Sequence, residues 1–444
     1  MKLKKVTAVL LTAAMTMAMV TGCGSSKEAA PAETKDTVAE APADNTEKEA
    51  EKTEEKSGGK ITFMVNVVGE QADILEKMSK QFEQETGNVV EFSAPGKNYE
   101  ELMKTKMSSN ELPDVFSTHG WSVARYSEYL MPVNDQPFYS QIKSQMLPVI
   151  TSKEGETYVL PIDANIAGMV YNLDVLEDSG VNVDDLKTWD DFAAACDKIK
   201  AKGYTPVRIG GKDQWTIGQY FDWVAPSFYI TDANNSKAEE LKAGKFDTAT
   251  WEQVGEMMKK WLEAGYFNED VLTADYNADI QALATNKAAF CFYPNSATID
   301  MKKVNPEAKV GMMAIPAVSK DDEPSLIAGE GIAVGVWKDS PNKEIAVEFL
   351  NYLAKPEVMS QIATVTGNQA GLEGVTSEIG ELQQYYDKYS SLEAFPYFDR
   401  EYLPSGLWDV MCTTGAEILA GTKNAVPDAG KVMEQSFNDK FIAN

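Results

Sequence analysis

The chain has 444 residues, with 41 Lys and Arg against 68 Asp and Glu, and a formal net charge of −27 at pH 7. Such an acidic chain repels phosphate backbones, which argues against nucleic acid as a partner and favours a neutral or cationic ligand. A single histidine, His119, and four cysteines without metal-ligand spacing argue against histidine catalysis and a histidine-bound metal, and we expect neither metal nor cofactor.

The N-terminal segment has the pattern of a bacterial signal peptide. Three lysines in residues 1–5 precede a 15-residue run of apolar and small residues at 6–20, which is shorter than the ~20 residues of a membrane span. The run ends in Val-Thr-Gly-Cys23, which resembles the lipobox of bacterial lipoproteins. We therefore expect residues 1–22 to be removed and Cys23 to carry a lipid that holds the mature protein on the extracytoplasmic face of the cell membrane. An ordinary secretory peptide that contains a cysteine by chance is the alternative.

The next segment is predicted to be a disordered tether. Residues 24–59 contain no aromatic residue, a single valine, five lysines and ten acidic residues. Such a composition buries too little apolar surface to offset chain entropy. We expect the lipid-anchored linker, residues 23–59, only to hold the folded part away from the membrane.

From Lys60 on, strands and helices alternate. Strands are predicted at 61–65, 89–92 and 113–116, and helices at 72–85 and 99–108, the first with Ile74, Leu75, Met78 and Phe82 on one face. This order predicts an α/β lobe whose ligand edge lies at the carboxyl ends of the strands.

A second α/β series follows, and about 385 residues after the tether are enough for two lobes. Cys196, Cys291 and Cys412 lie in apolar stretches, which predicts buried free thiols. In chain order the further elements are a strand at 167–171, a helix at 189–201, a strand at 206–209, helices at 216–223, 250–264 and 278–284, strands at 288–292, 310–315 and 331–336, and helices at 342–353, 408–420 and 429–441.

Six short stretches carry a family resemblance. They are 82–87 (FEQETG), 112–115 (LPDV), 158–161 (YVLP), 171–174 (YNLD), 187–192 (KTWDDF) and 340–344 (SPNKE). In this order they resemble the extracellular solute-binding proteins of ABC importers, in the carbohydrate-binding family that includes maltose-binding protein. Each stretch is a weak signal alone, whereas six in order are a strong one.

The resemblance implies a two-lobed, type II periplasmic-binding-protein-like fold, with lobes joined by a hinge that the chain crosses several times. Residues 60–161 and about 331–374 would form the first lobe, and 162–330 and about 375–444 the second. It also implies a monomer that captures a sugar or oligosaccharide between the lobes and delivers it to an ABC transporter permease, without catalysis.

A sugar site needs aromatic faces for the C–H surfaces of the ring and polar groups for its hydroxyls. Residues of these types that follow predicted strands, lie at predicted lobe crossings or match positions of the family are the candidate ligand residues. They are Glu70, Trp121, Asp163, Asn165, Trp215, Tyr220, Tyr293, Asn295, Glu330 and Trp408.

One position departs from the family, which commonly has a Gly-x-Trp after the strand at 288–292. Here the chain has Tyr293 and Asn295, so that either Tyr293 supplies the ring or Asn295 a hydroxyl partner. The identity of the sugar therefore stays open, and maltose is not indicated.

Purely structural roles are the alternatives to these ligand assignments. Trp215 and Trp408 open predicted helices and could serve packing, Asp163 could be a cap or turn residue, and Glu330 could pair with a lysine. Two other functions also stay open: a receptor of the same fold for a peptide, polyamine or iron complex, and a surface glycoside hydrolase with paired carboxylates. A deep arginine would favour a carboxylate ligand over a sugar.

Overall fold

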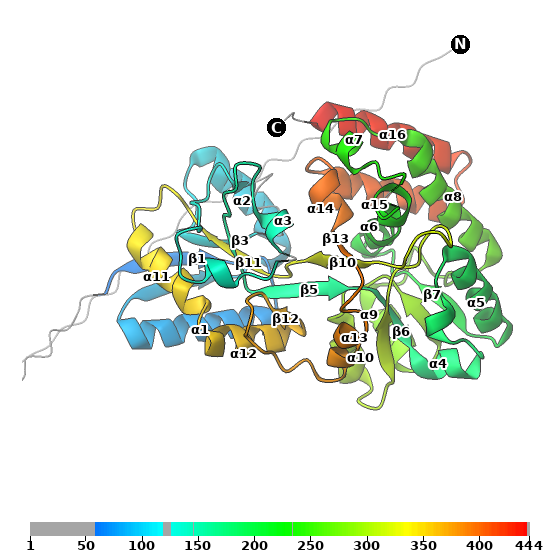
Figure 1. Ribbon diagram of the computed structural model, residues 1–444, viewed down its shortest axis with the longest axis horizontal. Helices are drawn as coiled ribbons and strands as arrows, with labels where there is room; N and C mark the ends of the chain where they lie inside the picture. The colour runs from blue at the N-terminus through cyan, green and yellow to red at the C-terminus, as the bar shows by residue number, and fades with distance from the viewer. Residues whose placement is uncertain (1–57, 119–125, 145, 233, 442–444) are drawn as a thin grey trace, which may run out of the picture. The chain divides into compact units, whose positions relative to one another are not determined.

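The computed structural model describes residues 58–118, 126–144, 146–232 and 234–441. Residues from 56 onward form one unit, in which three sheets alternate with helices (Figure 1). Within these described ranges no helix is both long and apolar enough to cross a membrane.

The first sheet has the strand order β2-β1-β3-β11-β4. The first three strands run parallel and confirm the predicted β-α-β-α-β order, whereas β11 enters from far along the chain and pairs antiparallel with β3 and β4. Its strands are β1 (Lys60–Met64), β2 (Val89–Ser93), β3 (Val115–Thr118), β4 (Leu160–Pro161) and β11 (Ala333–Val336). Its helices are α1 (Glu70–Thr86), α2 (Tyr99–Ser109), α3 (Leu147–Ile150), α11 (Lys343–Leu353) and α12 (Pro356–Thr366).

The second sheet, called the hinge sheet below, has the order β12-β5-β10-β13. Its middle strands β5 and β10 are antiparallel neighbours, and β10 runs parallel to β13. Because β5 joins β4 to β6, and β10 joins β9 to β11, both connect the first sheet with the third (Figure 1). The strands are β5 (Asp163–Ala167), β10 (Leu326–Gly329), β12 (Gln369–Ala370) and β13 (Ala394–Pro396).

The third sheet has the order β7-β8-β6-β9, with β7 parallel to β8 and β6 antiparallel to both its neighbours. Its strands are β6 (Met169–Asn172), β7 (Thr205–Arg208), β8 (Ala288–Cys291) and β9 (Val310–Met313). The helices of this region are α4 (Leu173–Asp178), α5 (Trp189–Ala201), α6 (Trp215–Tyr229), α7 (Ala238–Lys242), α8 (Thr248–Ala264), α9 (Tyr276–Ala284), α10 (Ala297–Val304), α13 (Gln383–Lys388), α14 (Phe398–Tyr402), α15 (Leu407–Leu419) and α16 (Ala425–Lys440).

Local sequence explains several element ends. Helix α5 begins at the predicted residue because Thr188 and Asp191 form a reciprocal capping box. The single strand predicted at 167–171 is wrong, since the chain breaks at Gly168 into β5 and β6. A Cβ atom there would lie 1.9 Å from the carbonyl oxygen of Met313, so the chain passes too close to β9 for any side chain.

Two large hydrophobic cores are present. One draws its residues from 61–164 and 328–372, the other from 167–327 and 379–437. The three described cysteines are buried and free, as predicted. The exact lobe boundaries stay a prediction.

Candidate functional site

The Asp163 carboxylate accepts hydrogen bonds from two other segments at the hinge sheet. Its side chain is fully buried, and Oδ1 accepts from the backbone N–H groups of Gly331 (2.7 Å) and Ile332 (2.8 Å). Oδ2 accepts from Nδ2 of Asn368 at 2.9 Å. The carboxylate therefore ties β5 to the segment before β11 and to the segment after α12.

Asn165 and Asn295 present two buried amide oxygens close to the hinge sheet. Nδ2 of Asn165 donates to the Tyr397 hydroxyl at 2.6 Å, and Nδ2 of Asn295 donates to the Ile166 carbonyl at 2.6 Å and the Tyr386 hydroxyl at 3.0 Å. Oδ1 of each asparagine is buried without a hydrogen-bond partner among the described residues. Both amides can thus accept a further donor.

Glu330 lies between β10 and β11 and is only 1% exposed. Neither of its carboxylate oxygens has a hydrogen-bond partner in the described part of the chain. Burial raises the pKa of Glu330 to about 7, with the Arg400 guanidinium acting in the opposite direction and Asp163 adding to the rise. Arg400 itself donates to the backbone oxygen of Glu330 at 3.1 Å and stacks on the Tyr397 ring, 4.1 Å from its centroid.

An aromatic group surrounds Trp215, the first residue of α6. The indole is 36% exposed, and its ring centroid lies 5.4 Å from that of Tyr276 and 5.5 Å from that of Tyr293. Beneath it, the Tyr293 hydroxyl donates to Asp279, which also accepts from Nε of Arg208 at 2.7 Å. The exposed indole therefore rests on a ring whose position is fixed from below.

Trp408 lies beside this aromatic group. It is partly buried near the start of α15, and a Cβ atom at Gly218 would lie 3.0 Å from its ring. Gly218 follows Trp215 by three residues in α6, so the two positions are neighbours on the helix surface. The structure thus brings Trp215 and Tyr293 into contact and places Trp408 against Gly218, one turn along the same helix.

Tyr220 has a different position. Its side chain is fully buried in the second core, 5.2 Å from the Phe292 ring and 5.9 Å from the Trp261 ring. The ring therefore contributes packing at this place.

Glu70 begins α1 and is exposed, with an ion pair of 2.8 Å between Oε2 and Nζ of Lys303 on α10. With Ile299 of α10 and Thr364 of α12 it lines a crevice of about 410 Å³. The remaining predicted site residues, Trp121 and the lipidation residue Cys23, lie outside the described residues.

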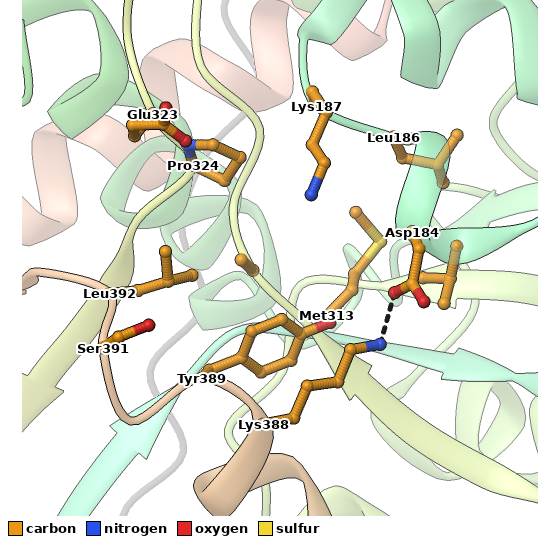
Figure 2. Close-up of a pocket in the computed structure, with 12 residues that line it drawn as sticks. Asp184, Leu186, Lys187, Met313, Glu323, Pro324, Lys388, Tyr389, Ser391 and Leu392 are labelled. Atoms are coloured by element: carbon orange, nitrogen blue, oxygen red, sulfur yellow. Dashed lines mark hydrogen bonds and ion pairs between the residues drawn. The ribbon is translucent and has the colours of Figure 1, made fainter.

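A second pocket, of about 250 Å³, has none of the described ligand candidates in its lining. Figure 2 shows its side chains, among them Lys187, Met313 and Tyr389, around the opening, with Asp184 and Lys388 joined by an ion pair. It belongs to the region of the third sheet.

The structure adds residues that the sequence interpretation missed. Tyr276 stands beside Trp215, and Tyr397, Arg400 and Asn368 surround the hinge sheet. The aromatic-rich run 395–400 (FPYFDR) was an available signal for two of them, whereas nothing local distinguishes Asn368.

Comparison with known proteins agrees with this architecture. The model of the bacterial extracellular solute-binding protein family matches residues 68–360. The melibiose/raffinose/stachyose-binding protein MelE of Bacillus subtilis (strain 168) is 33% identical over 352 residues, 78% of this chain and 82% of that protein. The multiple sugar-binding protein of Streptococcus mutans is 23% identical over 316 residues, 68% and 73% of the two chains.

Solved structures are similar over most of the chain. A sugar transporter protein from Bacillus licheniformis in complex with stachyose has a TM-score of 0.78 and 32% identity, covering 86% of this chain and 100% of that one. A binding protein from Bacillus subtilis in an open conformation has a TM-score of 0.81 and 30% identity, covering 86% and 98%. The two α/β lobes with several crossings confirm the predicted fold class, and the chain belongs to the family of bacterial extracellular solute-binding proteins.

Proposed function

We propose that this protein captures a neutral oligosaccharide related to melibiose, raffinose or stachyose and delivers it to an ABC transporter permease. The observation that carries the proposal is the exposed Trp215 on its fixed aromatic base, in a fold that also holds buried oxygens without donors at its hinge sheet. A sugar offers both an apolar face and hydroxyl donors, so it suits such a combination. The relatives named for these sugars support it.

The proposed ligand residues follow from the geometry. Trp215 and Trp408 would supply ring faces, and Tyr293 would hold Trp215 in place from below. Asn165, Asn295 and Glu330 would accept from hydroxyls. Glu70 and Trp121 remain proposed contacts at the first lobe, while Asp163 and Tyr220 would act through the hinge and through packing.

Arg400 bears on the alternative ligand class. An arginine deep in the site would favour a carboxylate ligand, but this guanidinium already engages the Glu330 carbonyl oxygen and the Tyr397 ring. A neutral sugar is therefore the better match.

The proposal includes a lipid anchor at Cys23, a monomeric state, two lobes divided near residues 161, 330 and 374, and binding without turnover. Anchoring would keep the receptor close to its transporter, which an enzyme acting on soluble sugars does not need.

Isothermal titration of the folded part, residues 58–444, with raffinose, stachyose, melibiose and maltose tests the proposal. We expect saturable binding of at least one of the first three sugars, and a rise in unfolding temperature with its concentration. Absence of binding to all four would contradict a sugar function. Release of monosaccharides from a bound oligosaccharide would instead support a hydrolase.

A further inference from the structure

We propose that Glu330 couples sugar capture to proton release: its buried carboxyl group, whose oxygens have no hydrogen-bond partner among the described residues, becomes an ionised acceptor of a sugar hydroxyl in the complex. This inference rests on the proposed sugar-binding function.

The backbone around Glu330 is held tightly on both sides. A Cβ atom at Gly329 would lie 2.4 Å from the ring of Tyr397, and one at Gly331 would lie 2.9 Å from both carboxylate oxygens of Asp163. No side chain fits at either neighbour without displacing these groups, so Glu330 is the one side chain between Ala328 and Ile332. The backbone at Glu330 therefore has a defined position at the hinge.

Glu330 and two asparagines at the hinge sheet have buried acceptor oxygens without donors. Both of its oxygens and Oδ1 of Asn165 are buried without a hydrogen-bond partner among the described residues, as is Oδ1 of Asn295. Asn165 lies opposite Gly329 in the pairing of β5 with β10. Buried acceptors without donors are costly, so the group is suited to a ligand that brings several hydroxyl donors.

The charges that face Glu330 come from two packed elements. Asp163 on β5 disfavours the ionised form and Arg400 on α14 favours it, while the neutral Tyr397 hydroxyl accepts from Asn165 rather than donating to the carboxylate. Burial dominates and raises the pKa to about 7. Protonated and ionised forms therefore coexist near neutral pH.

Sugar binding shifts this balance in one direction. A hydroxyl that donates to the ionised carboxylate stabilises the charged form and lowers the pKa of Glu330. The proton then leaves to the buffer, and no covalent bond forms or breaks. By linkage, the affinity for the sugar should rise with pH through the range in which the free carboxyl group titrates.

Titration calorimetry with raffinose, in buffers of different ionisation enthalpy, measures the released proton directly. At pH 7 we expect about half a proton per bound sugar, and an affinity about tenfold weaker at pH 6 than at pH 8. Glu330→Gln should abolish the release and flatten the pH profile, whereas Glu434→Gln on the exposed face of α16 should leave both unchanged.

His119 needs its own control, because the ordinary pKa of histidine lies in the same range. His119→Gln should retain the proton release if Glu330 is its source. Should Glu330→Gln not fold, the absence of proton release in the wild type would still overturn the inference, and release that persists in His119→Gln would still exclude the histidine as its source.

Distinct results would overturn the inference. Raffinose binding without proton exchange, or exchange that persists in a folded Glu330→Gln variant, would contradict it and leave the sugar function intact. Stabilisation by Ca²⁺ alone that Glu330→Gln removes would show a cation, not a hydroxyl, as the partner of these oxygens. Failure of the wild-type protein to bind raffinose, stachyose or melibiose would instead contradict the proposed function itself.

Discussion

The rings of Trp215 and Tyr293 lie 5.5 Å apart between centroids and are tilted by 45°. Tyr293 is almost fully buried and its hydroxyl is held by Asp279, whereas Trp215 keeps about a third of its surface exposed. One residue of the pair therefore supplies a surface and the other fixes it. Both were candidate ligand residues, but their contact distinguishes their roles.

Removal of the exposed ring should weaken sugar binding. We expect Trp215→Ala to reduce the affinity by about 1–3 kcal/mol, because a sugar loses its stacking face. Trp215→Phe should recover part of the loss, and Trp408→Ala should weaken binding similarly. Titration calorimetry measures all three, and unchanged affinity in both alanine variants would remove these residues from the site.

The Asp163 carboxylate should matter most for stability. Asp163→Asn replaces one of two oxygens that accept from Gly331, Ile332 and Asn368, so at least one buried donor loses its partner. We expect a loss of about 2–4 kcal/mol in the free energy of unfolding, measured by urea denaturation. Asp428→Asn, at an exposed position of α16, is the matched control. An equal, small effect of both variants would contradict a fastening role.

The raised pKa of Asp222 predicts that the free energy of unfolding depends on pH. Burial raises its pKa to about 6, above the ordinary value of about 4, so the folded state holds the proton more tightly than the unfolded state. The free energy of unfolding should therefore fall by up to about 3 kcal/mol between pH 4 and pH 6 on account of this group and stay level above.

Asp222→Asn should remove this part of the pH dependence while its amide oxygen still accepts from the Asp399 N–H, a bond of 2.8 Å in the wild type. Asp409→Asn, at an exposed position of α15, serves as control. Urea denaturation at several pH values measures the difference, and identical profiles of the wild type and Asp222→Asn would disprove the assignment.

Substituting Glu70 and Lys303 one at a time can tell whether Glu70 binds the sugar or serves only its ion pair with Lys303. Both side chains are more than half exposed, so the pair should contribute below about 1 kcal/mol to stability. If Glu70 contacts the sugar, Glu70→Gln should lower the affinity several-fold, whereas Lys303→Met should not. Equal effects of the two variants on affinity would favour a role through the ion pair alone.

Cys23 can be tested in cells. Cys23→Ser removes the thiol that would carry the lipid, so the protein should move from the membrane fraction to the soluble extracytoplasmic fraction. Its sugar affinity should not change, because Cys23 is not among the residues proposed to contact the sugar. Retention of the variant in the membrane fraction would argue for a different anchor.

The sequence predicted those helices whose ends and buried face are marked by local residues. Helix α5 has a capping box, and α1 has an apolar face and ends at a left-handed Gly87, so both were found within two residues at each end. The strands β10, β12 and β13 were missed. They are four residues or shorter, and their pairing partners lie far away in the sequence.

The same reason limits prediction of the site. Trp215 and Glu330 could be named from residue type and context, but the Tyr276 ring comes to Trp215 only because the fold brings the first residue of α9 to the first residue of α6. Tyr220 shows the opposite case, since a residue of suitable type proves to lie in the core. Which side of a helix faces the ligand depends on contacts that the local sequence does not contain.

The position of β11 in the first sheet bears on how the chain folds after export. This strand lies between β3 and β4, although about 170 residues separate it from β4 along the chain. A chain that emerges from its N-terminus can pair β1, β2 and β3 early, but the gap between β3 and β4 stays open until residue 336 has crossed the membrane. Completion of the first sheet is therefore a late event, and until then one edge of β3 has no strand beside it.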